Sequence, residues 1–240
     1  MTRAVIITGA AGGIGAALCE RMRQDGYLAI GIDRKPAPVA DKSLQFDLSD
    51  SEQLVDLGRE LARDYELKAV VHNGASQPIA QAGETALADW MDALRVNVIA
   101  VDALISGTRD NLASNDGSVV VISSVHARAT SGGVTAYATT KAALEGWVRS
   151  AAIDLAPAIR VNAVAPGAID TAKLREGFAR WGESAEERKD VLRRRTALRR
   201  IGDPSEVAGA VSFLIGDDAR FITGTVLVVD GGATARLGSE

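Results

Sequence analysis

The chain has 240 residues, 47% of them hydrophobic and 24% charged, which is enough for one large α/β domain with a substantial core. A net charge of −4 provides no basic face for nucleic acid. The apolar runs 119–122 and 226–229 are too short to cross a bilayer, and no secretory leader pattern opens the chain. The single cysteine, Cys19, cannot form an internal disulfide, so we expect a reduced, cytoplasmic setting. With two histidines and no spaced cluster of ligands, no metal site is expected.

Short β-branched runs alternate with longer helical stretches, which is typical of βαβ units around a parallel sheet. The predicted strands are 3–8, 28–33, 43–47, 67–73, 117–123, 159–165 and 225–229. The predicted helices are 13–25, 50–64, 85–113, 135–155 and 204–216, the last with an Asp203-Pro204 start and Glu206 in its first turn. Several strands are almost wholly apolar, as expected when helices cover both faces. The pattern predicts an α/β fold, a Rossmann-like doubly wound parallel sheet of about seven strands, with residues 1–240 as a single domain.

A glycine-rich stretch, residues 8–15, joins the first strand to the first helix. Gly9 permits a tight turn, Gly13 lets the backbone approach a pyrophosphate, and Gly15 allows close packing of helix and strand. The N–H groups at the helix start attract phosphates. A glycine turn can be purely structural, but the strand before and the helix after it indicate a dinucleotide site.

Asp33 ends the second predicted strand, 18 residues after Gly15. A carboxylate there accepts hydrogen bonds from the adenosine ribose and repels a 2′-phosphate, so the sequence favours NAD over NADP. The adjacent Arg34 complicates this, because it can stack on adenine or pair with a phosphate. Asp47, after the third strand, is placed to reach the adenine amino group, although aspartate also commonly starts loops.

Tyr137 and Lys141 are four residues apart on a predicted helix and therefore share one face. Oxidation of an alcohol needs a base, and a tyrosine of ordinary pKa, about 10, must drop by roughly three units to serve as one. We expect the lysine ammonium and the charge of oxidised nicotinamide to lower that pKa. Ser124, at a strand end, is placed to bind the substrate oxygen. Asn97 lies in a helical run, where an exposed amide is unremarkable but a buried one could hold a water that relays protons to Lys141.

The segment 171–200 carries ten lysines and arginines against five acids, inside an acidic chain. It lies between a strand end and the final helix, where a loop over an active site is expected. It is interpreted either as a solvated helical pair or subunit contact, or as a substrate lid that favours anionic groups.

Separated motifs in a fixed order make the chain resemble single-domain short-chain dehydrogenases/reductases over nearly its whole length. They are Thr8-Gly9-Ala10-Ala11-Gly12-Gly13-Ile14-Gly15, Asp47-Leu48, Asn97, Ser123-Ser124, Tyr137-Ala138-Thr139-Thr140-Lys141, Pro166-Gly167-Ala168-Ile169-Asp170-Thr171 and Asp230-Gly231-Gly232. The resemblance implies catalytic roles for Ser124, Tyr137, Lys141 and Asn97. It implies cofactor contacts from Gly9, Gly12, Gly13, Ile14, Gly15, Asp33, Arg34, Asp47, Leu48, Asn73, Gly74, Tyr137, Lys141, Pro166, Gly167, Ile169 and Thr171.

One motif departs from the family pattern. Where the family usually has Asn-Asn-Ala-Gly after the fourth strand, this chain has His72-Asn73-Gly74-Ala75. The histidine replaces an amide that braces the sheet, and we expect it to be structural rather than catalytic.

The resemblance implies an NAD-dependent oxidoreductase that moves a hydride between nicotinamide and the hydroxyl or carbonyl carbon of a small alcohol, polyol, sugar or cyclic alcohol. An NADP-dependent ketoreductase of the 3-oxoacyl-carrier-protein reductase type is the alternative, and a nonenzymatic NAD-binding regulator is a rival from another class. Candidate substrate contacts are Ser124, Tyr137, His126, Gln77 and Trp181. Relatives are commonly homotetramers or homodimers, so an oligomer is expected, through helices 85–113 and 135–155 and through the final helix and strand.

Overall fold

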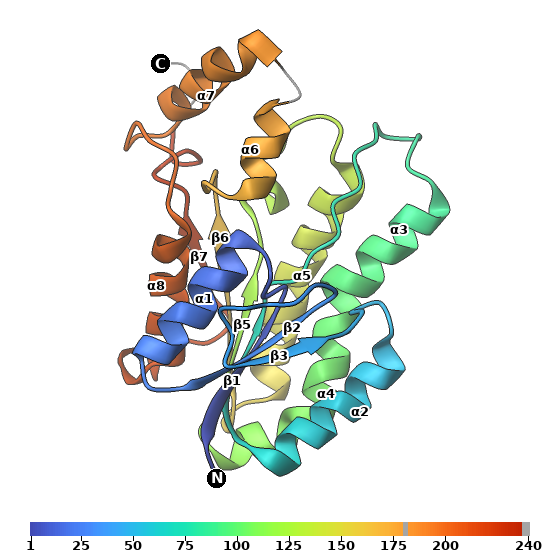
Figure 1. Cartoon of the computed structure of the whole chain (residues 1–240), viewed down its shortest axis with the longest axis vertical. Helices are drawn as coiled ribbons and strands as arrows, with labels where there is room; N and C mark the ends of the chain where they lie inside the picture. Colours follow the sequence, from blue (N-terminus) through green and yellow to red (C-terminus); the bar gives the residue numbers. More distant parts are fainter. Residues whose placement is uncertain (180–181, 237–240) are drawn as a thin grey trace.

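The fold is a three-layer α/β arrangement, seen in a computed structural model that describes residues 1–179 and 182–236 (Figure 1). A parallel sheet of seven strands has the order β3-β2-β1-β4-β5-β6-β7. The predicted fold class is confirmed, and each predicted strand is found within about two residues of its expected bounds. The strands are β1 Arg3–Thr8, β2 Leu28–Asp33, β3 Lys42–Gln45, β4 Glu66–His72, β5 Ser118–Ile122, β6 Arg160–Pro166 and β7 Val226–Val229.

Helices cover both faces of the sheet (Figure 1). One face packs against α1 and α8, and the other against α2, α4 and α5. The helices are α1 Gly13–Gln24, α2 Ser51–Asp64, α3 Leu87–Leu94, α4 Ala100–Ser114, α5 Thr135–Asp154, α6 Ala172–Ala179, α7 Ala185–Arg195 and α8 Pro204–Ile215. No helix in the described part of the chain combines the length and apolar character that a bilayer crossing requires.

The chain reverses its direction of travel across the sheet between β1 and β4. The strands β1 to β3 extend to one side, whereas β4 to β7 extend to the other. Thr8 and His72 pair at the carboxyl ends of β1 and β4. Ligands of doubly wound sheets bind at such a reversal, beyond the carboxyl ends of the strands.

Two predicted segments have internal structure that periodicity does not reveal. The helical run predicted for 85–113 contains a π-helical turn, Arg95–Ile99, between α3 and α4, and Asn97 is buried inside it. The segment 171–200 forms a helical pair, α6 and α7, joined by a short turn, and lies beyond the carboxyl edge of the sheet (Figure 1). Position alone does not distinguish a lid from a solvated pair, so its function stays a prediction.

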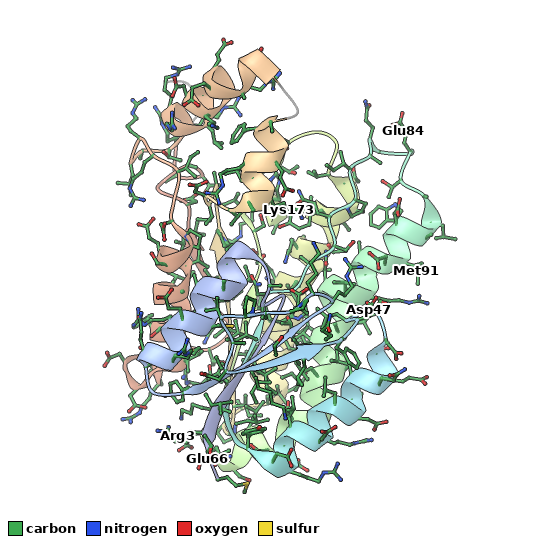
Figure 2. All side chains as sticks on the ribbon, viewed as in Figure 1. Arg3, Asp47, Glu66, Glu84, Met91 and Lys173 are labelled. Atoms are coloured by element: carbon green, nitrogen blue, oxygen red, sulfur yellow. The ribbon has the colours of Figure 1, made fainter. Side chains whose placement is uncertain are left out.

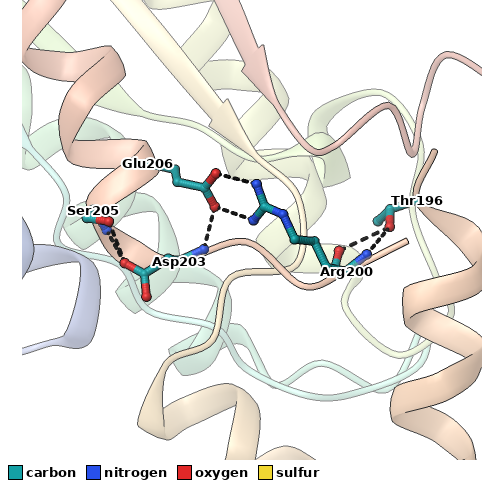
Figure 3. Close-up of polar contacts among 5 residues, drawn as sticks. All are labelled: Thr196, Arg200, Asp203, Ser205 and Glu206. Atoms are coloured by element: carbon teal, nitrogen blue, oxygen red, sulfur yellow. Dashed lines mark hydrogen bonds and ion pairs between the residues drawn. The ribbon is translucent and has the colours of Figure 1, made fainter. Parts of the chain in front are cut away.

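The start of α8 is fixed as the sequence predicts. Asp203 caps the helix through the N–H of Ser205, and Glu206 accepts the backbone N–H of Asp203, which completes a capping box (Figure 3). Arg200 adds a bidentate ion pair with Glu206, with both N–O distances 2.6 Å. These contacts tie the end of the 171–200 segment to α8.

Helices α2 and α4 cross where Gly58 and Gly107 face each other. A Cβ on Gly58 would lie 3.2 Å from Cα of Gly107, and a Cβ on Gly107 would collide with the carbonyl oxygen of Val55. The two helices therefore pack with their backbones in close contact, and residues of both join the same core cluster against the sheet.

Gly107→Ala is therefore expected to lower the free energy of unfolding by about 1–3 kcal/mol, because the methyl group forces the helices apart. Gly146→Ala on α5 is the matched control, since its Cβ would meet nothing closer than 3.8 Å. The control should gain about 0.5–1 kcal/mol from helix propensity. Denaturant unfolding measures both, and a Gly107→Ala protein as stable as wild type would contradict the packing described.

Candidate active site

The loop between β1 and α1 is packed too closely for any residue larger than glycine at two points. Gly9 has a φ of +66°, and a Cβ there would lie 2.7 Å from Cα of Gly74. A Cβ on Gly15 would collide with the carbonyl oxygen of Gly9. The loop therefore lies directly against the end of β4 and against its own helix.

The first turn of α1 offers backbone donors. Gly12 caps the helix without a side-chain hydrogen bond, so no cap satisfies the first N–H groups, including those of Gly13 and Ile14. The methyl group of Thr171 lies 3.0 Å from the position of a Cβ on Gly13, which closes the cradle from the side of α6. These donors and the positive helix end fit the oxygen atoms of a pyrophosphate.

Asp33 lies beside this loop. Its carboxylate accepts the N–H of Ala11 at 3.1 Å and the N–H of Lys35 at 3.0 Å. Arg34 is exposed, as it must be to stack on adenine or to pair with a phosphate. A carboxylate fixed at this point fits ribose hydroxyls and opposes a phosphate.

Asp47 and Leu48 lie on the predicted adenine side of the cofactor site. Asp47 is exposed, and a hydrogen bond from the N–H of Ser49 holds the pKa of its carboxyl below the usual range. Leu48 is buried and would collide with a Cβ on Gly74. Asn73 binds the carbonyl groups at the start of the glycine loop, with its amide nitrogen 3.2 and 3.0 Å from them.

The predicted nicotinamide side follows β6. Pro166 ends the strand, and a Cβ on Gly167 would lie 2.7 Å from the Cβ of Asp230. Ile169 is buried, and the chain then reaches Thr171 above the glycine loop. The structure thus brings the predicted cofactor residues from five loops to one edge of the sheet.

His72 is completely buried at the end of β4. The Thr8 hydroxyl oxygen accepts the N–H groups of Asn73 and Gly74 at 3.1 and 3.0 Å. Its own proton is therefore directed to Nδ1 of His72, 3.0 Å away, which places the ring proton on Nε2. Burial, and then the charge of Lys141, lower the pKa of His72 to about 3, so the ring is neutral.

The predicted catalytic side chains come together where β5 meets α5. Ser124 is buried and close enough to Tyr137 to lower the pKa of its phenol, and its hydroxyl oxygen accepts the N–H of His126 at 3.2 Å. The ammonium of Lys141 lies 5.6 Å from the centroid of the Tyr137 ring and donates to the carbonyl of Ile122 at 2.6 Å. The four-residue spacing does place the phenol and the ammonium on one face.

The pKa of Tyr137 differs from the sequence-based expectation. Burial raises the pKa of the phenol, and the hydrogen bond with Ser124 opposes this only partly. Lys141 is 2% exposed, and burial followed by repulsion from Lys173 lowers its pKa to about 7. The protein alone therefore does not produce the activated tyrosine; a further positive charge is needed.

Asn97 braces the site from behind. Its amide oxygen accepts the N–H of Ser76 at 2.7 Å, and its amide nitrogen donates to the carbonyl of Ser76 at 2.9 Å and to the hydroxyl of Thr140 at 2.8 Å. Thr140 in turn donates to the carbonyl of Tyr137 at 2.9 Å. Both amide protons of Asn97 are thus donated within the protein. The proton relay from Asn97 through a water to Lys141 stays a prediction, and it would not use the side-chain N–H groups of Asn97.

The structure places some of the predicted substrate residues close to Tyr137. The ring of His126 lies edge-on to that of Tyr137, with centroids 5.9 Å apart, and its Nδ1 is 2.8 Å from the Thr130 hydroxyl. Gln77 is half-buried in the loop after β4. Trp181 lies outside the described residues.

Comparisons with known proteins identify the family of the chain. A family model described as enoyl-(acyl carrier protein) reductase matches residues 9–234. The chain is 33% identical to dehydrogenase/reductase SDR family member 4 of Pongo abelii, over 98% of this chain and 88% of the relative. The chain belongs to the short-chain dehydrogenase/reductase family.

Solved structures of other members are similar over their whole length. Ligand-free aldohexose dehydrogenase of Thermoplasma acidophilum has a TM-score of 0.94 and 30% sequence identity, covering 100% of this chain and 96% of that one. An NADP-bound structure described as an NAD(P)-dependent gluconate 5-dehydrogenase of Beutenbergia cavernae has a TM-score of 0.89 and 29% identity, covering 98% and 97%. The protein is thus a short-chain, NAD(P)-dependent oxidoreductase.

The hydrogen bonds of three residues in this short-chain dehydrogenase/reductase site were not predicted from the sequence. Thr8 and Thr140 belong to motifs already recognised, since they adjoin Gly9 and Lys141. Ser76 was predicted only as a possible wall residue of the substrate site, and the fold brings it to Asn97.

The buried, neutral ring of His72 should make the free energy of unfolding depend on pH. In the unfolded chain its pKa is about 6.5, so on acidification the unfolded state takes up a proton that the folded state refuses. The free energy of unfolding should therefore fall below pH ~6.5, by up to about 1.4 kcal/mol per pH unit from this group. Unfolding curves measured between roughly pH 4.5 and 7.5 should show a much shallower slope for His72→Asn. His126→Asn should change the slope less, because His126 is only half-buried and burial lowers the pKa of its ring as well. An unchanged slope in His72→Asn would show that His72 is not the group whose protonation the folded state disfavours.

Proposed function

We propose that the protein is an NAD-dependent dehydrogenase/reductase that moves a hydride between nicotinamide and the hydroxyl or carbonyl carbon of a small hydroxy compound. The observation that supports this most directly is the position of the Lys141 ammonium, 5.6 Å from the centroid of the Tyr137 ring, with buried Ser124 on the other side of the phenol acting on its pKa. The pair lies at the same sheet edge as the glycine loop, so one crevice serves both cofactor and substrate.

Tyr137 is proposed as the acid/base. In oxidation its phenol oxygen takes the proton of the substrate hydroxyl, and in reduction it returns that proton to the carbonyl oxygen. Nicotinamide, when bound, accepts or supplies the hydride. The Ser124 oxygen accepts the N–H of His126, which fixes the hydroxyl beside the phenol. With substrate bound, the Ser124 proton is proposed to hold the substrate oxygen in line. Lys141 stabilises the phenolate by charge, since its ammonium points toward the ring from a buried position.

NAD is proposed over NADP because of Asp33. Its carboxylate is held by two backbone N–H groups at the strand end, where a 2′-phosphate would meet a fixed negative charge. The NADP-bound relative and the exposed Arg34 favour the alternative, an NADP-linked ketoreductase of the 3-oxoacyl-carrier-protein type.

Polyols, sugars and related hydroxy compounds are the proposed substrates, since the similar structures carry the names of an aldohexose and a gluconate dehydrogenase. A homotetramer or homodimer is proposed as well. Exposed apolar side chains support it, with Ile153 on α5 at 79% and Phe213 on α8 at 42% exposure, on helices expected to form the interfaces.

Tyr137→Phe is expected to lower kcat/KM about 100-fold or more, because the proton acceptor is lost. NADH binding, followed by fluorescence, should change little. Tyr65→Phe is the matched control, because Tyr65 follows α2 at the opposite, amino edge of the sheet. Undiminished hydride transfer in Tyr137→Phe would rule out the phenol as acid/base.

Wild-type protein is expected to use NAD about 10- to 100-fold more efficiently than NADP, as one unfavourable charge contact costs roughly 1–3 kcal/mol. Asp33→Asn keeps the shape and removes the charge, so the preference should shrink by about tenfold. Asp64→Asn, at the end of α2, is the control. Equal use of both cofactors by the wild type would contradict the role given to Asp33.

A further inference from the structure

The turn 123–128 follows β5 and carries Ser124 past the phenol of Tyr137. Ser124 begins a short 3-10 helix, and its hydroxyl oxygen accepts the N–H of His126 at 3.2 Å. The ring of His126 lies 5.9 Å from that of Tyr137, centroid to centroid, which places the turn beside the phenol. The local hydrogen bonds set the shape of the turn, but they do not set its position against α5.

A buried carboxylate of α5 binds this turn at both of its ends. Glu145 is 5% exposed, and one of its carboxylate oxygens accepts the hydroxyl of Ser123 at 3.2 Å. The other oxygen accepts the Nε–H of Arg128 at 3.1 Å and forms an ion pair with it. Ser123 precedes Ser124 and Arg128 follows it by four residues. A single side chain therefore spans the segment that carries Ser124.

The carboxylate of Glu145 is directed to the turn rather than to Lys141. The two residues are four apart on α5 and share one face of the helix. In the part of the chain that the structure describes, they form no ion pair, and the ammonium of Lys141 donates to the carbonyl of Ile122. The charge of Glu145 is therefore compensated at the turn, by Arg128.

Stability alone does not account for a buried carboxylate at this position. Taking a carboxylate out of water costs free energy that its partner only partly returns, and packed apolar side chains often stabilise a core as well or better. The side chain of Arg128 is 55% exposed, so water screens the attraction to Glu145. What the two hydrogen bonds of the carboxylate add is geometry, because together they fix the turn in one position relative to α5.

We propose that Glu145 is a positioning residue, which acts with Arg128 to keep the hydroxyl of Ser124 beside the phenol. This rests on the proposed function and adds a residue to its machinery. Among the described residues, no hydrogen bond or ion pair joins Glu145 to Tyr137 or to the glycine loop, so its effect passes through the turn. Releasing the turn should leave NADH binding intact and misplace the group that holds the substrate oxygen.

Glu145→Gln keeps the shape of the side chain and removes its charge. With NAD and the best substrate among D-glucose, D-glucitol and D-gluconate, kcat/KM should fall about tenfold, mainly through kcat, while NADH affinity stays unchanged. Arg128→Met should reproduce the loss, and Arg128→Lys should restore most of it. Glu66→Gln is the matched control, because it breaks the ion pair with Arg3, which lies at the end of the sheet away from α6 (Figure 2).

A double-mutant cycle separates positioning from general stability. Ser124→Ala removes the hydroxyl that Glu145 is proposed to hold, so adding Glu145→Gln to Ser124→Ala should cost less than about twofold in kcat/KM. The pKa of Tyr137 provides a readout without turnover, since Ser124 lowers it. In protein whose other two tyrosines are replaced by phenylalanine, near-ultraviolet absorbance should show this pKa rising equally in both single variants.

Three results would overturn the proposal. One is a wild-type kcat/KM in Glu145→Gln, and another is an effect that multiplies with that of Ser124→Ala, as a general loss of stability would give. The third is an equal loss in Glu66→Gln. Turnover of none of the three compounds counts against the proposed function instead. In that case the titration of Tyr137 decides, and a pKa unmoved by Glu145→Gln rejects the positioning role.

Discussion

An ammonium group held away from water, without a carboxylate to neutralise it, is the constraint on which this site depends. Lys141 is 2% exposed, and the carbonyl of Ile122 is its hydrogen-bond acceptor. Burying an uncompensated charge costs roughly several kcal/mol. Burial accordingly lowers the pKa of Lys141 to about 7, and a phenolate at Tyr137 would supply the negative charge that favours the ammonium. The buried amine and the phenol are thus linked electrostatically.

Around this charge the protein places neutral polar groups. Thr8 and His72 tie the glycine loop to the end of β4, and Asn97 and Thr140 tie the π-helical turn to the backbone of Tyr137. A protonated His72 would add a further positive charge, but burial and the charge of Lys141 keep the ring neutral, and the hydrogen bond from Thr8 sets its tautomer. Neutral networks of this kind hold geometry without altering the charge balance.

The sequence was sufficient for features that depend on local spacing. The strand and helix pattern, the glycine loop, the capping box at Asp203 and the shared face of Tyr137 and Lys141 were all predicted. Features that depend on burial were not. A helical period cannot reveal the π-helical turn at Asn97, and the direction of the Tyr137 pKa shift depends on how deeply the fold buries the phenol.

The most direct measurement is the titration of Tyr137 itself. The chain has three tyrosines, so Tyr27→Phe/Tyr65→Phe protein leaves one phenol whose ionisation near-ultraviolet absorbance can follow. Without cofactor its pKa should lie above 10, as burial demands. Saturation with NAD should lower it by roughly three units, and the fall should disappear in Lys141→Met. A tyrosine pKa unmoved by NAD would contradict the account of the site.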